Sequence, residues 1–206
     1  MDIDEIMEDV PLGNVYSGSL QEVVDSGKKY KLIYLDPPWK YGNSRWSNKG
    51  VGKLHYPRME EDEIAALPVP QLADSNCIMF MWTTAVHLPT SLRLIEHWGF
   101  TYKTVGFTWV KLKRDGVEPV NGPGSYTRSA SEFCLIATRG SGFTTSRKDC
   151  NVNQVILSIR REHSRKPDEA ILCLQRLFGD ISRIELFSRC PREGWDVWGN
   201  EPTKFT

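Results

Sequence analysis

Few features of this 206-residue sequence assign it to a common class at first sight. No run of apolar residues approaches the ~18 that a membrane-spanning helix needs, and no apolar stretch follows a basic start as in a secretory signal. Excess basic charge is missing too, because 26 Lys and Arg residues are balanced by 26 Asp and Glu residues. With no internal repeat and no low-complexity tract, the length and the 40% hydrophobic content favour one globular domain in the cytoplasm or nucleus.

Cysteine usage indicates neither a disulfide framework nor a zinc site. The chain has five widely spaced cysteines, an odd number, without a C-x-x-C pair: Cys77, Cys134, Cys150, Cys173 and Cys190. Disulfide-rich domains use even numbers, and zinc sites use closely spaced ligands. His55 and His163 have no metal-ligand spacing either. We therefore expect reduced, mostly buried cysteines and no metal site.

The charges are unevenly placed although they balance overall. The first nine residues are rich in Asp and Glu, and groups of basic residues follow at 40–58, 111–114 and 160–166. Taken singly, each basic group is most simply a solvated loop. The grouping alone therefore does not indicate a binding surface.

Six short apolar runs rich in β-branched and aromatic residues predict β-strands at 31–35, 77–82, 104–110, 133–138, 155–159 and 183–187. Their almost continuous apolarity is typical of strands covered on both faces. Two helices with readable ends lie between them. One begins near Pro89 and ends at Gly99, and the other begins at Pro167 and ends at Gly179. This alternation predicts an open α/β sheet.

Two segments, 41–57 and 111–128, are longer than ordinary connections and are rich in Gly, Pro, Asn and basic residues. Long loops in compact domains are often functional. Ligands of open α/β sheets bind outside the carboxyl ends of the strands. Because residues 41–57 follow the first strand almost directly, we expect them to act as a gate over a site there.

The stretch YLDPPWKY at residues 34–41 is the most unusual in the chain. Neither proline can donate a ladder hydrogen bond and each restricts the residue before it, so the strand must end at Asp36. The rigid segment that follows holds the Asp36 carboxylate, at least one unpaired backbone carbonyl and the Trp39 ring in a fixed relation. A strand with an ordinary proline turn is the plainer alternative.

A carboxylate beside a fixed carbonyl can activate an exocyclic amino group of adenine or cytosine. Such a group is a poor nucleophile because its lone pair is delocalised into the ring. If Asp36 and the carbonyl of Pro37 accept its two hydrogens, the nitrogen becomes pyramidal and its developing positive charge is stabilised. Trp39, or a neighbouring aromatic residue, can stack on a base that is flipped out of a duplex.

Further segments follow this motif in one order: HYPRMEEDEI, RSASEFCLIATRG, HSRKPDEAILCLQRLFG and RIELFSRCPREGWDVWGNE. From about residue 14 to 201, the chain closely resembles the S-adenosylmethionine-dependent adenine amino-methyltransferases. That family includes the catalytic subunit of the eukaryotic messenger-RNA adenosine methyltransferase and DNA enzymes of bacteria and phages. The resemblance implies a Rossmann-like methyltransferase fold, with an open, mostly parallel sheet, helices on both faces and a permuted motif order.

The resemblance also implies the domain limits and the catalytic motif. We expect a methyltransferase domain at 14–201, between a flexible acidic segment at 1–13 and a tail at 202–206. The catalytic motif comprises Asp36, Pro37, Pro38 and Trp39. Tyr56 corresponds to a gate-loop tyrosine near the target base, although it can also simply pack the loop.

The S-adenosylmethionine site that the resemblance implies comprises Gly18, Ser19, Asp36, Glu132, Lys166, Arg189, Asn200 and Glu201. In the family, the lysine binds the methionine end and pairs with the glutamate, while the arginine and the asparagine line the ribose. The stretch at 18–19 contacts the adenine of the cofactor. An exposed ion pair of little weight is the alternative for Lys166 and Glu132. The tryptophans at 82, 109, 195 and 198 are expected to pack in the core or at its rim.

Three positions depart from the messenger-RNA enzyme. Arg165 replaces a histidine, Glu201 replaces a glutamine, and Gly18 replaces a residue whose side chain accepts a hydrogen bond from the cofactor's adenine. The adenine contact must therefore come from the backbone or from another residue. A carboxylate at Glu201 still accepts hydrogen bonds from ribose hydroxyl groups.

We predict an enzyme that methylates the N6 amino group of adenine in DNA, because the compact chain matches bacterial and phage DNA enzymes. An RNA adenosine methyltransferase is the alternative, since the motif does not distinguish ribose from deoxyribose. A non-catalytic nucleic-acid-binding subunit is less favoured because the Asp-Pro-Pro-Trp sequence is intact. With few basic residues to spare, we expect a homodimer or a heterodimer with a related subunit.

Overall fold

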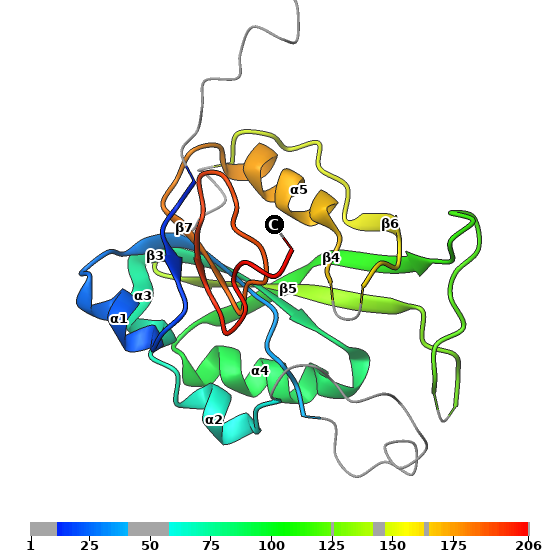
Figure 1. The fold of residues 1–206 in the computed structure, drawn as a ribbon, viewed down its shortest axis with the longest axis horizontal. Coiled ribbons are helices and arrows are strands. Elements are labelled where there is room, and N and C mark those ends of the chain that lie inside the picture. Colours follow the sequence, from blue (N-terminus) through cyan, green and yellow to red (C-terminus); the bar gives the residue numbers. More distant parts are fainter. Residues whose placement is uncertain (1–11, 41–57, 125, 142–146, 163–164, 206) are drawn as a thin grey trace, which may run out of the picture.

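The computed structural model describes residues 12–40, 58–124, 126–141, 147–162 and 165–205 (Figure 1). In this part of the chain, eight strands form one sheet in the order β1-β8-β7-β2-β3-β5-β4-β6. Neighbouring strands are parallel except that β5 is antiparallel to both β3 and β4. The sheet is therefore mixed and mostly parallel, as the α/β prediction requires.

The strands are β1 (Val15–Tyr16), β2 (Tyr30–Leu35), β3 (Ala73–Thr83), β4 (Thr101–Leu112), β5 (Ser131–Arg139), β6 (Val155–Ile159), β7 (Arg183–Leu186) and β8 (Asp196–Trp198). The six apolar runs in the sequence correspond to β2 through β7, so those predictions are confirmed. The two remaining strands contain only two and three residues. Segments this short carry no readable periodicity, which is why β1 and β8 were not predicted.

The two predicted helices are α4 (Leu88–His97) and α5 (Asp168–Phe178). Their ends are as expected: Pro89 lies in the first turn of α4, and the glycines after the two helices, Gly99 and Gly179, have positive φ angles of 74° and 63°. The shorter elements were not predicted: α1 (Leu20–Asp25), α2 (Glu61–Ala65), α3 (Val69–Leu72) and the 3-10 helix η2 (Ala85–His87). No helix in the described ranges is long and apolar enough to cross a membrane.

Helices cover both faces of the sheet. Helix α5 packs on the face to which Leu32 and Tyr34 of β2 point. The helices α1 to α4 pack on the opposite face, with Ile33 and Leu35. Successive residues of β2 thus enter different cores, as the two-residue period of a strand requires. Figure 1 shows α5 above the sheet and α2 and α4 below it.

Strand β6 corrects the expectation that every apolar strand is covered on both faces. Its residues alternate: Ile156 is buried with α5, whereas Val155, Leu157 and Ile159 are exposed. The reason is its place at the edge of the sheet, next to β4. The apolar run identified a strand but not its position in the sheet.

Most of the segment 111–128 is the long connection that its composition predicted, because β4 ends at Leu112 and β5 begins only at Ser131. Strand β4 extends to Leu112, and the chain then turns back so that Lys113 N donates to Glu118 O at 2.8 Å and Val120 N donates to Lys111 O at 2.8 Å. The start of this connection therefore forms a hairpin whose returning residues pair with the end of β4. The other long segment, 41–57, lies outside the described residues. Its role as a gate therefore stays a prediction.

The strand order reverses between β7 and β2. Strands β3 to β6 lie on one side of β2, whereas β7, β8 and β1 lie on the other side. In open α/β sheets, ligands bind at such a reversal, outside the carboxyl ends of the strands. Asp36 follows β2 at this position.

Asp196, at the start of β8, ties three strands together. Its carboxylate accepts hydrogen bonds from the Tyr30 hydroxyl at 2.6 Å and from Asn14 N at 2.9 Å, and it lies 2.7 Å from Lys28 Nζ. Burial alone raises the pKa of Asp196, but the hydrogen bonds from Lys28 and Tyr30 outweigh burial and hold the pKa below its usual range. The folded protein therefore favours the ionised carboxylate.

We expect Asp196→Ala to lower the free energy of unfolding by about 1–3 kcal/mol near neutral pH, because the buried Tyr30 hydroxyl loses its acceptor. Since the folded pKa lies below the unfolded value of about 3.9, this stabilisation is complete above that pH and is lost as the pH falls through the folded pKa. Urea denaturation at neutral and at acidic pH measures both effects. Asp180→Ala, at a fully exposed side chain, is the matched control and should change neither.

Candidate active site

Charged side chains from four segments meet at the carboxyl edge of the sheet. Asp36 follows β2, Lys111 lies near the end of β4, Glu132 is the second residue of β5, and Lys166 precedes α5. Because β5 is antiparallel to its neighbours, its amino end lies at their carboxyl ends. Lys166 Nζ donates to Asp36 Oδ2 at 2.6 Å and lies 3.1 Å from Glu132 Oε2. Lys111 pairs with the other oxygen of Glu132, so cations and anions alternate.

This cluster is largely shielded from solvent. The exposed side-chain fractions are 13% for Lys166, 14% for Glu132 and 26% for Asp36. Lys166 and Glu132 are therefore not the exposed ion pair that the sequence left open as an alternative. Asp36 is the most accessible of the three, as a group that meets a substrate must be.

The protonation states follow from burial and from the alternating charges. Burial raises the pKa of Asp36, and Lys166 only partly offsets this effect. Burial alone would lower the pKa of Lys166, but Asp36 and Glu132 outweigh burial and raise it, so the ammonium group stays charged. Burial likewise opposes ionisation of Glu132, but Lys166 and Lys111 lower its pKa. Glu132 therefore ionises more readily than an ordinary glutamate, and Asp36 less readily than an ordinary aspartate.

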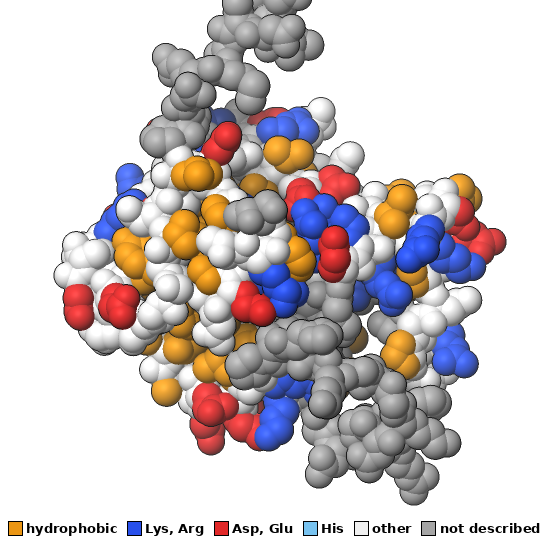
Figure 2. Space-filling model, viewed as in Figure 1, with side chains coloured by type: hydrophobic (Ala, Val, Ile, Leu, Met, Phe, Trp, Pro, Cys, Tyr) orange, Lys and Arg blue, Asp and Glu red, His pale blue; other side chains and the backbone are white. Residues whose placement is uncertain are grey.

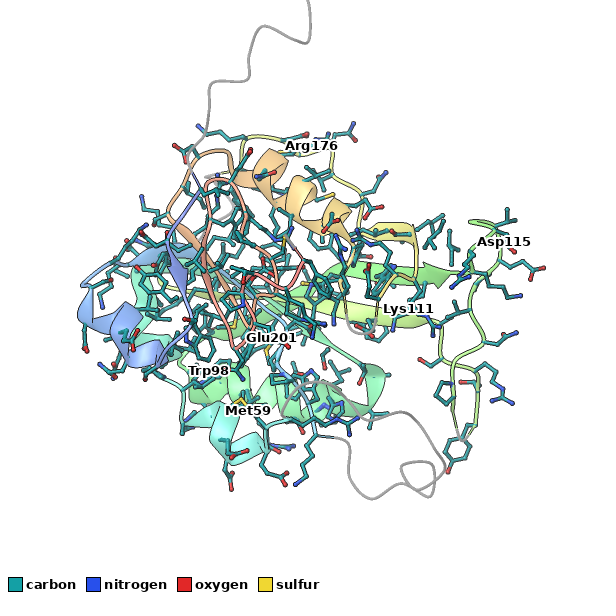
Figure 3. The ribbon with its side chains drawn as sticks, in the orientation of Figure 1. Met59, Trp98, Lys111, Asp115, Arg176 and Glu201 are labelled. Carbon is teal, nitrogen blue, oxygen red and sulfur yellow. The ribbon has the colours of Figure 1, made fainter. Side chains whose placement is uncertain are left out.

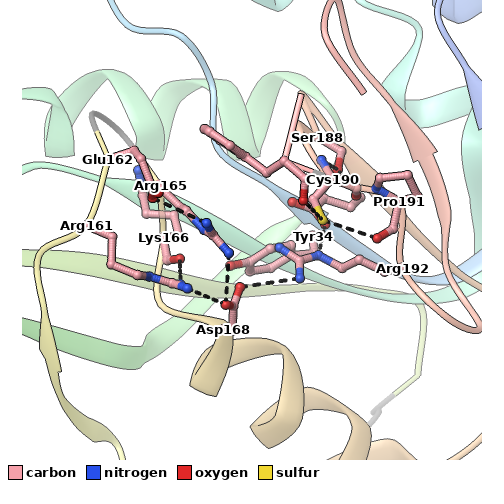
Figure 4. A network of polar contacts seen from close by, with 12 residues as sticks. Tyr34, Arg161, Glu162, Arg165, Lys166, Asp168, Ser188, Cys190, Pro191 and Arg192 are labelled. Carbon is pink, nitrogen blue, oxygen red and sulfur yellow. Dashed lines mark hydrogen bonds and ion pairs between the residues drawn. The ribbon is translucent and has the colours of Figure 1, made fainter. Parts of the chain in front are cut away.

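A network of arginines holds Lys166 in place (Figure 4). The carboxylate of Asp168, in the first turn of α5, lies 2.6 Å from Arg161, 3.4 Å from Arg165 and 3.5 Å from Arg192. Arg161 also donates to the carbonyl oxygen of Lys166 at 3.1 Å. An acidic side chain at a helix N-terminus is itself favourable. The segment that carries Lys166 is therefore held in two ways. The side chains of Arg161 and Arg165 pair with Asp168 of α5, and Arg161 binds the backbone carbonyl of Lys166.

Asp-Pro-Pro-Trp forms a tight turn after β2. Trp39 N donates to Pro37 O at 2.9 Å, and Pro38 O accepts a hydrogen bond from Met59 N at 3.0 Å. The carbonyls of Pro37 and Pro38 thus each accept one hydrogen bond within the described residues, and the Pro37 carbonyl, the proposed acceptor, is already used once in the turn. Trp39 carries the first backbone N–H after the prolines, and a three-residue turn returns this group to Pro37. A carbonyl oxygen has two lone pairs, so Pro37 can still accept a second hydrogen bond.

The Trp39 ring is only 8% exposed and belongs to the core beneath the site. It stacks on His87, with ring centroids 5.2 Å apart and an interplanar angle of 13°. One ring face is thus taken by an imidazole whose pKa is lowered by burial. The ring anchors the turn, and stacking of Trp39 on a base stays a prediction for the other face. Tyr56 lies outside the described residues.

The other predicted site residues lie along the same edge, beyond β7, β8 and β1. Gly18 O accepts a hydrogen bond from Trp198 Nε1 at 2.9 Å, and the Ser19 hydroxyl caps α1 by accepting from Gln21 N at 3.1 Å. Arg189 Nε lies 4.0 Å from Glu201 Oε2, and Asn200 is exposed beside it. Within the described ranges, the hydrogen bonds and ion pairs do not join these residues to the cluster around Asp36.

Two residues near the site carried no usable signal in the sequence. Lys111 ends an apolar run, and only the β4–β5 pairing brings it to Glu132. Phe205, in the expected tail, contacts two guanidinium groups, because the centre of its ring lies 4.5 Å from Arg189 Cζ and 5.1 Å from Arg165 Cζ. Contacts of this kind join distant segments and are set by the fold.

The expectation for the four tryptophans is confirmed, because Trp82, Trp109, Trp195 and Trp198 are all buried. Trp82 Nε1 donates to the Tyr34 hydroxyl at 2.6 Å beneath the cluster. The expectation for the cysteines holds only in part. Cys77 and Cys134 are buried, Cys173 and Cys190 are half-buried, and Cys150 is exposed.

Comparison with known proteins identifies relatives along most of the chain. The MT-A70 family model matches residues 30–201. The Type II methyltransferase M.MunI of Mycoplasma sp is 38% identical over 190 residues, which cover 84% of this chain and 78% of that protein.

Two eukaryotic relatives are longer. A putative N(6)-adenosine-methyltransferase MT-A70-like protein of Medicago truncatula is 31% identical over 177 residues, 84% of this chain and 26% of that protein. The N6-methyladenosine RNA methyltransferase MTA1 of Cryphonectria parasitica is 30% identical over 186 residues, 85% of this chain and 52% of that protein. The chain thus spans most of the Mycoplasma relative but only about a quarter to a half of these two.

Proposed function

This chain belongs to the MT-A70 family, and we propose that it transfers a methyl group from S-adenosylmethionine to the N6 amino group of adenine in DNA. The choice of DNA rests on the type II methyltransferase, of which the chain spans 78%. The observation that carries the proposed chemistry is the Asp36 carboxylate, held 2.6 Å from Lys166 beside the Pro37 carbonyl at the carboxyl edge of the sheet.

We further infer a Rossmann-like methyltransferase fold in permuted order, with a domain at 14–201. In support, the catalytic motif follows β2, early in the chain, whereas Lys166, Arg189 and Glu201 come late and still lie at the same edge. The acidic segment at 1–13 and the tail at 202–206 stay part of this proposal. So do the gate-loop role of Tyr56, dimer formation and a bacterial cytoplasmic location, which rest on resemblance.

The residues at the edge suit S-adenosylmethionine, whose methionine end carries both an ammonium and a carboxylate group. Glu132 and Lys166 present one charge of each sign within one shielded cluster, next to Asp36. Arg189 and Glu201 supply a donor and an acceptor for ribose hydroxyl groups, with Asn200 next to them. Ser19 and the backbone of Gly18 lie after β1, at the far end of the same edge, where the adenine would bind. When bound, S-adenosylmethionine supplies a methyl group on a positively charged sulfur.

The chain's own residues act on the amino group of the target adenine. The Asp36 carboxylate accepts one amino hydrogen, and the second lone pair of the Pro37 carbonyl accepts the other. Both acceptors are held rigidly by the proline turn, so they stabilise the positive charge that develops on nitrogen without reorganising. After transfer the nitrogen carries one proton too many. Asp36, whose pKa is raised by burial, can accept that proton.

The proposal is tested by incubating the protein with labelled S-adenosylmethionine and with DNA and RNA oligonucleotides of the same base sequence. Mass spectrometry should identify N6-methyladenine in the DNA. An oligonucleotide without adenine is the control and should stay unlabelled. Methylation of the RNA instead of the DNA would favour the second candidate, an RNA methyltransferase like the fungal relative. Methylation of cytosine would exclude both candidates.

We expect turnover to fall on the acidic side at a pH above the ordinary aspartate value of about 3.9. The reason is that Asp36 must be ionised to accept a hydrogen, and burial raises its pKa. Because the charge of Glu132 also raises the pKa of Asp36, Glu132→Gln should move the acidic limb of the kcat profile to lower pH. Glu96→Gln, at an exposed side chain of α4, is the control. An acidic limb that does not respond to Glu132→Gln would assign the titration to another group.

A further inference from the structure

The basic groups at 111–114 and 160–166 meet in the folded chain. Strands β4 and β6 are parallel, with Leu112 opposite Ile159, so both basic segments leave the sheet at the same edge. Arg160 N donates to Leu112 O at 3.0 Å and joins them directly. Together they line a surface hollow of ≈ 270 Å³, whose charged lining residues are Lys113, Arg114, Arg160 and Arg161.

Figure 2 shows Lys and Arg side chains gathered over these ends of β4 and β6. In the part of the chain that the structure describes, no Asp or Glu lines the hollow. Two of its cations have nearby partners, because Lys113 pairs with Glu118 and Arg161 lies 2.6 Å from Asp168. The local charge is therefore positive although the whole chain is neutral.

Arg114 and Arg160 are the two cations of the hollow that are left to bind a ligand. Both are exposed, and among the described residues neither guanidinium forms a hydrogen bond or an ion pair. The nearest acid along the chain, Asp115, accepts hydrogen bonds from Val117 N at 2.9 Å and Glu118 N at 3.3 Å. Figure 3 shows Asp115 at the outer part of the hairpin, beyond Lys111. The Asp115 carboxylate is thus engaged by backbone N–H groups of the turn.

The hollow adjoins the catalytic cluster. Lys111, two residues before Lys113, is linked through Glu132 and Lys166 to Asp36. Arg161, which lines the hollow, also donates to the carbonyl oxygen of Lys166. A base that reaches Asp36 therefore brings the flanking backbone of its strand to the edge where Arg114 and Arg160 lie.

We propose that the hollow lined by Lys113, Arg114, Arg160 and Arg161 binds phosphate groups of the DNA strand that flank the target adenine. Guanidinium groups match phosphate oxygens with two parallel hydrogen bonds, and DNA carries one negative charge per ~1.7 Å of helix axis. Phosphate contacts position the strand without reading its sequence. The inference rests on the proposed function, because it assigns the surface that holds the substrate of the same site.

The test uses the variant Arg114→Gln/Arg160→Gln and a fluorescently labelled DNA duplex that contains adenine. Fluorescence anisotropy at several salt concentrations should show affinity weakened at least about tenfold at low salt, and a salt slope smaller by about 2, one per lost contact. KM for the duplex should rise, whereas kcat at saturating DNA and the Kd for S-adenosylmethionine should not change. The matched control, Lys31→Gln/Lys103→Gln, removes two exposed cations near the amino ends of β2 and β4, away from the hollow. It should retain the wild-type dependence of affinity on salt.

Wild-type affinity and slope in the arginine variant would overturn the phosphate site. So would an equal loss in the control variant, or a parallel loss of S-adenosylmethionine affinity, because either result indicates a general effect. Anisotropy does not require turnover. If the wild-type protein binds the duplex through these arginines but methylates only RNA, the phosphate site stands and the proposed DNA methylation fails.

Discussion

Asp36→Ala is expected to lower the rate of methyl transfer by about 10²–10³-fold, the loss typical of removing one preorganised group that stabilises a transition state. Asp36→Asn should fall between the wild type and Asp36→Ala, because asparagine keeps a carbonyl acceptor in nearly the same place but loses the negative charge. The assay is single-turnover transfer to an adenine-containing DNA oligonucleotide, with the product identified by mass spectrometry. Asp180→Asn and Asp180→Ala, at a fully exposed position, are matched controls.

S-adenosylmethionine binding should change much less than turnover in the Asp36 variants. When the Asp36 carboxylate is removed, Lys166 keeps Glu132 as an ion-pair partner at 3.1 Å. The lysine charge therefore stays paired, and its side chain stays in place. A change confined to the rate identifies an interaction made mainly in the transition state. Near wild-type turnover in Asp36→Ala would rule out the catalytic role of Asp36. A loss of cofactor affinity as large as the loss of turnover would reassign it to cofactor binding.

Lys166→Met is the second change with a large expected effect, because it should damage both stability and cofactor affinity. It leaves Asp36 and Glu132 as two shielded carboxylates, and among the described residues the remaining ion pair of the cluster is that of Lys111 with Glu132. Removing one partner of a buried ion pair costs about 3–5 kcal/mol, and the partial exposure of Asp36 places this site near the lower value. The affinity for S-adenosylmethionine should fall more than tenfold, roughly 1.4 kcal/mol. Urea denaturation and calorimetry measure the two effects.

A second substitution separates the two roles of Lys166. Lys166→Met/Glu132→Gln removes one uncompensated anion, so it should regain part of the stability but none of the cofactor affinity. The stability deficit of Lys166→Met should also shrink as the pH falls, because protonation of the carboxylates removes their repulsion. Lys40→Met, which breaks an exposed pair with Glu60, is the control and should have little effect. Recovery of both properties in the double variant would leave Lys166 with a structural role only.

Local pattern determined much of this fold. The apolar runs and the helix-ending glycines predict β2 to β7, α4 and α5, because these signals depend on neighbours within a few residues. The proline pair ended β2 at the position where the structure has Asp36. Resemblance added Glu132 and Lys166 to the motif, and they lie in contact with each other and next to Asp36.

Only the tertiary structure decided which groups meet. Lys166 and Asp36 are 130 residues apart, and they pair because β6, like β2, ends at the carboxyl edge of the sheet and Lys166 lies between β6 and α5. The contact of Lys111 with Glu132 depends on β5 running antiparallel to β4. The exposure of Leu157 and the meeting of Arg114 with Arg160 likewise follow from the order of the strands in the sheet. The sequence by itself determined the elements and the motif residues through local preferences, whereas the partners of each charge depend on long-range pairing that no local pattern encodes.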